Sequence, residues 1–155
     1  MFQDKQNNSF YWVGTTRFND ETLLENRRFV ENKLESPWRC IYPSPKKINS
    51  NVIPLNGVIL VIEMNNEQNQ VCGFSKIKNY LYAHENVYRN RSYNQFIYKG
   101  TKHVPREMIS PDILCDIEKK VFKGSSHLKR GYGIMKVPQD KFTPEEIDYI
   151  RNILN

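Results

Sequence analysis

Residues 56–79, NGVILVIEMNNEQNQVCGFSKIKN, decide how this chain folds. Val58 to Glu63 is a short, almost wholly aliphatic run bounded by turn-forming residues, which is typical of a strand buried on both faces. Residues 65–69 are polar and favour a turn, and apolar and polar side chains then alternate from Gln70 to Lys78. The sequence therefore predicts an antiparallel β-hairpin at the centre of a strongly curved sheet. The side chains expected in its core are Ile59, Val61 and Val71.

One helix and two strands are predicted before this hairpin. The aromatic and β-branched stretch Phe10–Gly14 favours a first strand. A helix is expected over Glu21–Leu34, because Asn19 or Thr22 can cap its first turn. The second strand is predicted over Trp38–Tyr42.

Beyond the hairpin, residues 83–92 are the most polar part of the chain and favour a long exposed loop. The pattern then predicts a strand over 93–99, a helix over 108–120 and a short strand over 133–137. A last helix should begin after Thr143, since Pro144 suits its first position. Together these elements predict a single α+β domain, 1–155 with a core of about 10–154, with five to six strands and flanking helices.

Composition and length narrow the class of protein. The chain has 155 residues, 39% of them hydrophobic, and no apolar segment approaches the length that crosses a bilayer. The N-terminal residues carry an early acid and lack the apolar run of a signal peptide, so we expect a cytoplasmic or nuclear protein without membrane contact. Cys40, Cys72 and Cys115 are widely spaced, which favours reduced thiols. Neither they nor the three histidines have zinc-ligand spacing, so no metal or cofactor is expected.

Charge and aromatic content favour a nucleic-acid partner. The formal net charge is +6, and the chain has nine tyrosines, eight phenylalanines and two tryptophans. Phosphates bind Lys and Arg while bases stack on rings, so this combination is typical of proteins that bind RNA or DNA. The density of tyrosine between residues 80 and 98 exceeds what a core requires. The candidate phosphate-binding residues are Lys46, Lys47, Arg89, Arg91, Lys123, His127, Lys129 and Arg130.

The segment 122–133, FKGSSHLKRGYG, is the strongest single candidate for a ligand-binding loop. Its glycines would let the backbone approach a ligand, and its basic and hydroxyl side chains suit a phosphate. The glycine spacing matches neither the P-loop nor the dinucleotide-binding fingerprint. The alternative is a flexible surface turn with solvated charges.

Two resemblances add to this interpretation. The order of elements, with Tyr11-Trp12-Val13-Gly14 at the start and Cys72-Gly73-Phe74-Ser75 in the centre, resembles that of the PUA-like superfamily over residues 10–137, with the EVE and YTH branches closest. That resemblance implies a β-pseudobarrel that binds RNA or a modified base in an aromatic cage, to which Trp12 and Trp38 would contribute. The pieces LVIEMNN, YNQFIYKG and FKGSSHLKRGYG also resemble small proteins of large DNA viruses, a resemblance that brings no known activity with it.

The favoured hypothesis is a non-enzymatic nucleic-acid-binding domain in which Trp12, Trp38 and one of Tyr93 or Tyr98 stack on a base. One alternative is an enzyme that processes a nucleotide or nucleic acid, with His127 as its acid/base. Another is a viral adaptor whose aromatic face binds protein. A binding domain should have a concave aromatic pocket, an enzyme should place His127 beside a carboxylate or hydroxyl in a cleft, and an adaptor should expose a flat apolar patch.

Overall fold

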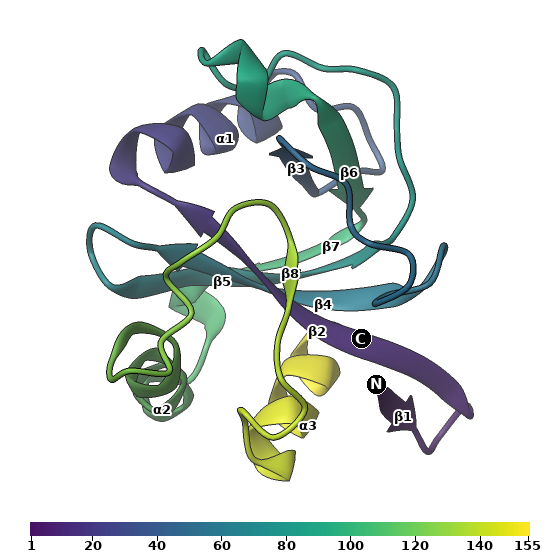
Figure 1. Ribbon diagram of the computed structural model, residues 1–155, viewed down its shortest axis with the longest axis vertical. Coiled ribbons are helices and arrows are strands. Elements are labelled where there is room, and N and C mark those ends of the chain that lie inside the picture. Colours follow the sequence, from purple (N-terminus) through teal and green to yellow (C-terminus); the bar gives the residue numbers. More distant parts are fainter.

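The computed structural model describes residues 1–155 as a mixed, six-stranded sheet with helices against it (Figure 1). In spatial order its strands are β1 (Phe2–Asp4), β2 (Ser9–Phe18), β4 (Val58–Asn65), β5 (Gln70–Lys78) and β7 (Lys102–Pro105), with β8 (Met135–Lys136) added beside β2. A separate two-stranded sheet pairs β3 (Cys40–Ser44) with β6 (Phe96–Gly100). The helices are α1 (Asp20–Asn32), α2 (Pro111–Phe122) and α3 (Pro144–Ile153). The α+β class is confirmed.

The predicted central hairpin is confirmed. β4 and β5 pair antiparallel, and Ile59, Val61 and Val71 are each 0% exposed. β4 also lies parallel to β2, so its aliphatic run has a hydrogen-bonded neighbour on either side. The hairpin register shifts by one residue after Glu63, and this bulge leaves Cys72 without a partner on β4.

The main sheet separates two apolar cores (Figure 1). Helices α2 and α3 cover one face, where residues such as Leu60, Phe74 and Ile117 pack together. Helix α1 and the β3–β6 sheet cover the other face, where Ile59 and Tyr98 are buried. The strand order runs from β1 to β7 without closing, so the main sheet is open and does not form a barrel.

Sequence-encoded caps begin two of the helices. Asn19 caps α1 by accepting a hydrogen bond from the Thr22 amide, and the Thr22 hydroxyl accepts in return from the Asn19 amide. Thr143 caps α3 in the same reciprocal way with Glu146. These pairs satisfy amide groups that a helix start otherwise leaves without partners.

Several elements differ from the sequence expectation: β3 covers Cys40–Ser44 rather than 38–42, and β1 was not predicted. Two further boundary differences have identifiable reasons. Strand β6 begins at Phe96 rather than residue 93, because Arg91–Asn94 forms a 3₁₀ turn held by the buried Asn94 side chain. Helix α2 begins at Pro111 rather than residue 108, because a separate 3₁₀ turn occupies Arg106–Met108 and Pro111 fits a first helical position. No helix of the chain combines the length and apolar character that crossing a bilayer requires.

Candidate functional site

An open cleft of about 720 Å³ lies where the end of β2 meets the start of α1. Its volume falls within the range of small-ligand sites. The loop between α2 and β8, which arches over this side of the sheet in Figure 1, forms another wall. The lining residues are Thr16, Arg17, Phe18, Asn19, Thr22, Pro43, Pro45, Asn66, Tyr88, Tyr93, Gly131, Tyr132 and Gly133.

Arg17 is the one charged residue in this lining. Its guanidinium donates to the carbonyl oxygens of Leu128 (2.8 Å) and Gly133 (3.2 Å) and to the Thr15 hydroxyl (2.5 Å). Burial lowers the pKa of Arg17 to about 10, so the side chain is still charged at neutral pH. No carboxylate pairs with it, although a partly buried guanidinium is ordinarily paired.

The same contacts fix the loop that closes the cleft. Arg17 binds carbonyls on both sides of Gly131, and the Asn66 side-chain amide donates to the Lys129 carbonyl at 2.9 Å. Gly131 and Gly133 have φ angles of +93° and +75°, a conformation that side chains rarely adopt. The loop is therefore a shaped wall, and Lys129 and Arg130 directly precede its lining residue Gly131.

Aromatic rings form much of the remaining wall. Tyr132 is 63% exposed, and the Lys46 ammonium lies 5.5 Å from the centroid of its ring. Across the lining, Tyr88 and Tyr93 meet edge to face at a centroid distance of 6.3 Å. Rings in such a cleft can stack on a planar ligand, while lysine beside a ring favours an anionic group close to that ligand.

Several basic residues that are close in the sequence to lining residues have no carboxylate partners. Arg89 and Arg91 lie between the lining residues Tyr88 and Tyr93 in the sequence, and neither forms an ion pair. Lys46, Lys129 and Arg130 also lack ion pairs. Glu25 accepts from the Arg89 backbone amide at 2.5 Å.

Asn66 adds an unused acceptor to the lining. Its amide nitrogen donates to Lys129, but its side-chain oxygen Oδ1 is buried without any hydrogen-bond partner. An unpaired buried polar atom costs free energy, which makes it uncommon in a finished structure.

Two residues expected to stack on a base are buried in the core instead. Trp12 is 8% exposed, and its ring packs close to Gly57. Tyr98 is 1% exposed, and its hydroxyl accepts from the Ile48 amide at 2.9 Å. Both are corrections to the sequence-based site, because aromatic residues on an alternating strand can point toward either face and both of these point inward.

Three further candidates lie away from the cleft. Trp38 packs edge-on against Tyr82 at 4.7 Å between centroids. The Lys47 ammonium lies 5.4 Å from the ring of Phe96. Lys123 lines a different groove, which runs along α2 on the other face of the sheet. Of the sequence-predicted site, Tyr93 lines the cleft and Lys46 contacts the lining residue Tyr132, while Arg89, Arg91, Lys129 and Arg130 are close in the sequence to lining residues.

His127 is engaged within its own loop. Its ring nitrogen Nδ1 accepts a hydrogen bond from the Lys129 amide at 3.2 Å, and its own amide donates to Gly124. The ring hydrogen-bonds no carboxylate or hydroxyl, and His127 does not line the cleft. The acid/base arrangement that the enzyme alternative needs is therefore not formed around His127.

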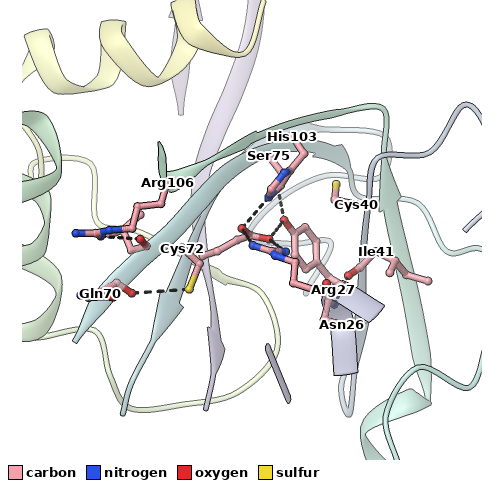
Figure 2. Close-up of polar contacts among 12 residues, drawn as sticks. Asn26, Arg27, Cys40, Ile41, Gln70, Cys72, Ser75, His103 and Arg106 are labelled. Atoms are coloured by element: carbon pink, nitrogen blue, oxygen red, sulfur yellow. Dashed lines mark hydrogen bonds and ion pairs between the residues drawn. The ribbon is translucent and has the colours of Figure 1, made fainter. Parts of the chain in front are cut away.

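The histidine that does meet a carboxylate is His103, in a closed cluster beneath α1 (Figure 2). His103 Nε2 lies 2.9 Å from Glu63 Oε1, and Arg27 from α1 contacts both carboxylate oxygens, at 2.7 and 3.2 Å. The Tyr42 hydroxyl donates to Glu63 Oε2 at 2.7 Å, with Ser75 Oγ 2.6 Å from that hydroxyl. Glu63 is 0% exposed.

This cluster uses every acceptor position that Glu63 has. Burial on its own would raise the pKa of Glu63, but the hydrogen bond from His103 and the charge of Arg27 hold that pKa well below its ordinary value. Gly73 makes room for the contact: a Cβ there would lie 2.8 Å from Glu63 Oε1 and 3.1 Å from His103 Nε2. A carboxylate so fully bonded holds α1 to the sheet and leaves no lone pair to act as a base.

Two functional features were missed in the sequence. The signal for Glu63 was a single carboxylate at the end of an aliphatic run, which implies a buried charge with partners. The signal for Arg17 was weaker: a basic residue between β-branched and aromatic residues, just before the helix cap Asn19.

Comparison of the chain with protein-family models, with curated proteins and with solved structures finds no match.

Proposed function

We propose that the protein is a nucleic-acid-binding domain that holds one nucleotide in the cleft between β2, α1 and the Gly131–Gly133 loop. The guanidinium of Arg17 and the lysines at the rim contact phosphate, and Tyr132, Tyr88 and Tyr93 surround the base. RNA and DNA both offer this chemistry.

One observation carries the proposal. Arg17 is charged, partly buried and without a carboxylate, and it lies in an open cleft whose other lining residues are neutral. Phosphate provides the missing negative charge, and the guanidinium still has N–H groups beyond those that bind Leu128, Gly133 and Thr15. The lining contains no histidine, cysteine or carboxylate, which favours binding over catalysis.

We also infer that the domain is related to the PUA-like superfamily and that the cleft accepts a modified base. The observed succession β2, α1, β3, β4, β5 and β6 is the order on which that resemblance rests. The main sheet is open, so the pseudobarrel would be made by β3–β6 lying across the sheet rather than by a closed strand circuit. An unused acceptor on Asn66 suits a base whose edge offers a donor.

Anisotropy titration of a labelled single-stranded oligonucleotide of about 12 nucleotides, a length within the site sizes of single-strand binders, tests the proposal. The log–log dependence of affinity on salt should have a slope of several units. Lys46→Gln should reduce that slope by about one, and Tyr132→Ala should weaken binding by about tenfold or more, since stacking is worth about 1–3 kcal/mol per base. Both side chains are exposed, so folding should be preserved.

Lys119→Gln is the matched control, because Lys119 is an exposed lysine on α2 that does not line the cleft. It should leave both affinity and slope within error. The proposal would be overturned by absence of binding at low salt, by a salt slope near zero, or by equal effects of Lys46→Gln and Lys119→Gln on binding. The net positive charge of the protein would then serve solubility only.

A further inference from the structure

Thr16 brings a hydroxyl to the cleft that the protein itself does not use. The residue is only 8% exposed, yet its hydroxyl forms no hydrogen bond within the protein. It is not among the fully enclosed side-chain atoms that lack a partner, so it reaches open space. Because Thr16 lines the cleft, that space is the cleft. A polar side chain so deeply buried ordinarily has a partner, and here a ligand can supply it.

Thr16 and Arg17 approach the cleft from the two faces of β2. Successive side chains of a strand point to opposite faces, and Thr16 shares its face with Trp12 and Phe18 of the core beneath α1. On the outer edge of β2, the pairing with β1 covers Ser9–Tyr11 and the pairing with β8 stops at Thr15. A ligand at this open edge can therefore meet the Thr16 hydroxyl from one face and the Arg17 guanidinium from the other.

The polar and aromatic groups of the lining suit different parts of a nucleotide. The charge of Arg17 suits the phosphate, and the three tyrosine rings suit the base. Asn19 and Thr22 are already bonded to each other at the cap of α1, so their side chains are committed to the helix. The sugar joins phosphate to base and lies between them. Thr16, which directly precedes Arg17 and is neutral, is the lining residue that suits the sugar.

We propose that the Thr16 hydroxyl hydrogen-bonds the 2′-hydroxyl of the bound nucleotide, so that the cleft selects ribose, and therefore RNA, over deoxyribose. The 2′-hydroxyl is both a donor and an acceptor, and it is the group by which a protein distinguishes RNA from DNA. A threonine hydroxyl has the same two capacities, so either partner can donate. Deoxyribose would leave the Thr16 hydroxyl buried beneath the ligand without a partner, which costs free energy. This inference rests on the proposed function, since it names the sugar of the nucleotide in the same cleft.

The test compares two labelled 12-nucleotide oligoadenylates, one with ribose and one with deoxyribose, which carry the same bases and phosphates. The native protein should bind the ribose probe about three- to tenfold more tightly, which is the effect of one neutral hydrogen bond. Thr16→Val removes the hydroxyl with little change of shape, so it should weaken binding of the ribose probe only. The ratio of the two Kd values should then fall toward one. Thr16→Ser keeps the hydroxyl and should keep the ratio.

Two controls isolate the hydroxyl. Thr101→Val, at an exposed threonine that does not line the cleft, should leave the Kd values of both probes unchanged. A 2′-O-methyl version of the ribose probe tests the same bond without altering the protein. Its methyl group removes the donor and adds bulk beside Thr16, so this probe should bind no more tightly than the deoxyribose probe. Thr16→Val should not lower the melting temperature, because the hydroxyl has no partner in the free protein.

The outcomes separate this inference from the proposed function. Equal affinity of the native protein for the ribose and deoxyribose probes, or a ratio that Thr16→Val leaves unchanged, would overturn the selection of ribose. An equal loss for both probes in Thr16→Val would assign the hydroxyl to the base or the phosphate and would also overturn it. In each case the proposed function would stand if Tyr132→Ala still weakened binding. A native protein that binds neither probe would overturn the proposed function as well.

Discussion

The Glu63 cluster and the Arg17 cleft belong to neighbouring strands of one sheet and treat buried charge in opposite ways. In the first, a fully buried carboxylate receives contacts from Arg27, His103 and Tyr42, and charge and hydrogen bonding are complete. In the second, a guanidinium binds backbone carbonyls and has no anion. The comparison teaches that a buried charge is a candidate for ligand binding only where no opposite charge in the protein already pairs with it. The following variants, from the largest expected effect to the smallest, break or sharpen this contrast.

Glu63→Gln should have the largest effect. It leaves Arg27 beneath α1 without its counter-charge, and breaking a buried ion pair typically costs about 3–5 kcal/mol. Urea denaturation should show that loss in the free energy of unfolding. Glu31→Gln, at an exposed position of the same helix, is the control and should change it by less than about 0.5 kcal/mol. If Glu63→Gln changed the free energy of unfolding as little as Glu31→Gln does, the Glu63 cluster would not contribute to stability.

Lowering the pH should gradually reduce the free energy of unfolding of the native protein, as Glu63→Gln does at neutral pH. The pKa of Glu63 is depressed in the folded state, so its contribution to stability is complete above the unfolded value of about 4.3 and disappears as pH falls toward the folded value. Denaturation between pH 6 and about pH 2 should show the gap between native protein and Glu63→Gln narrowing below about pH 4. A gap that stays constant over this range would contradict the assigned ion pairing.

Arg17→Gln should affect both folding and binding. It leaves the Leu128 and Gly133 carbonyls without their donor, which should cost about 1–3 kcal/mol, and it removes the one charge of the cleft lining. Arg17→Lys keeps that charge but cannot reach both carbonyls with a planar fork. The Arg17→Lys variant should therefore keep most of the salt dependence of binding of the native protein. Its free energy of unfolding should fall nearly as far as that of Arg17→Gln. Identical salt slopes for both variants would show that Arg17 acts only on the loop.

His127→Ala should have the smallest effect. One hydrogen bond within the loop is lost, from the Lys129 amide, which should lower the free energy of unfolding by about 0.5–1.5 kcal/mol at most. Affinity of the folded protein for the oligonucleotide should stay within about twofold, because Arg17 and Asn66 still hold the loop. A large loss of affinity without a change of melting temperature would restore His127 to the binding site.

Most of the strands and helices could be predicted from the sequence because each has a local cause, whereas the short strand β1 was not predicted. An aliphatic run between turn formers predicted β4, and Thr143 followed by Pro144 and Glu146 predicted α3. The basic loop at 122–133 was also recognisable, because its glycines and cations are adjacent in the chain.

The site itself depends on contacts that no local pattern contains. Arg17 and Leu128 are 111 residues apart, and Arg27 and Glu63 are 36 apart. Trp12 and Trp38 were predicted to stack on a base because of their ring chemistry. Whether such a side chain is exposed, however, depends on which face of the sheet its position occupies. Trp12 and Tyr98 face the core because their strand neighbours pack there, and this assignment needed the tertiary register.

The double contact of Arg17 with the arching loop also bears on how fast a ligand can bind. A single guanidinium holds carbonyls on both sides of Gly131, so the wall of the cleft is assembled before any ligand arrives. For the proposed nucleic-acid ligand, association should then need no slow rearrangement, and attraction between an anionic strand and a protein of net charge +6 should govern the encounter rate. We expect single-exponential binding kinetics whose rate constant rises linearly with oligonucleotide concentration, exceeds about 10⁷ M⁻¹s⁻¹ at low salt and falls steeply as salt is added.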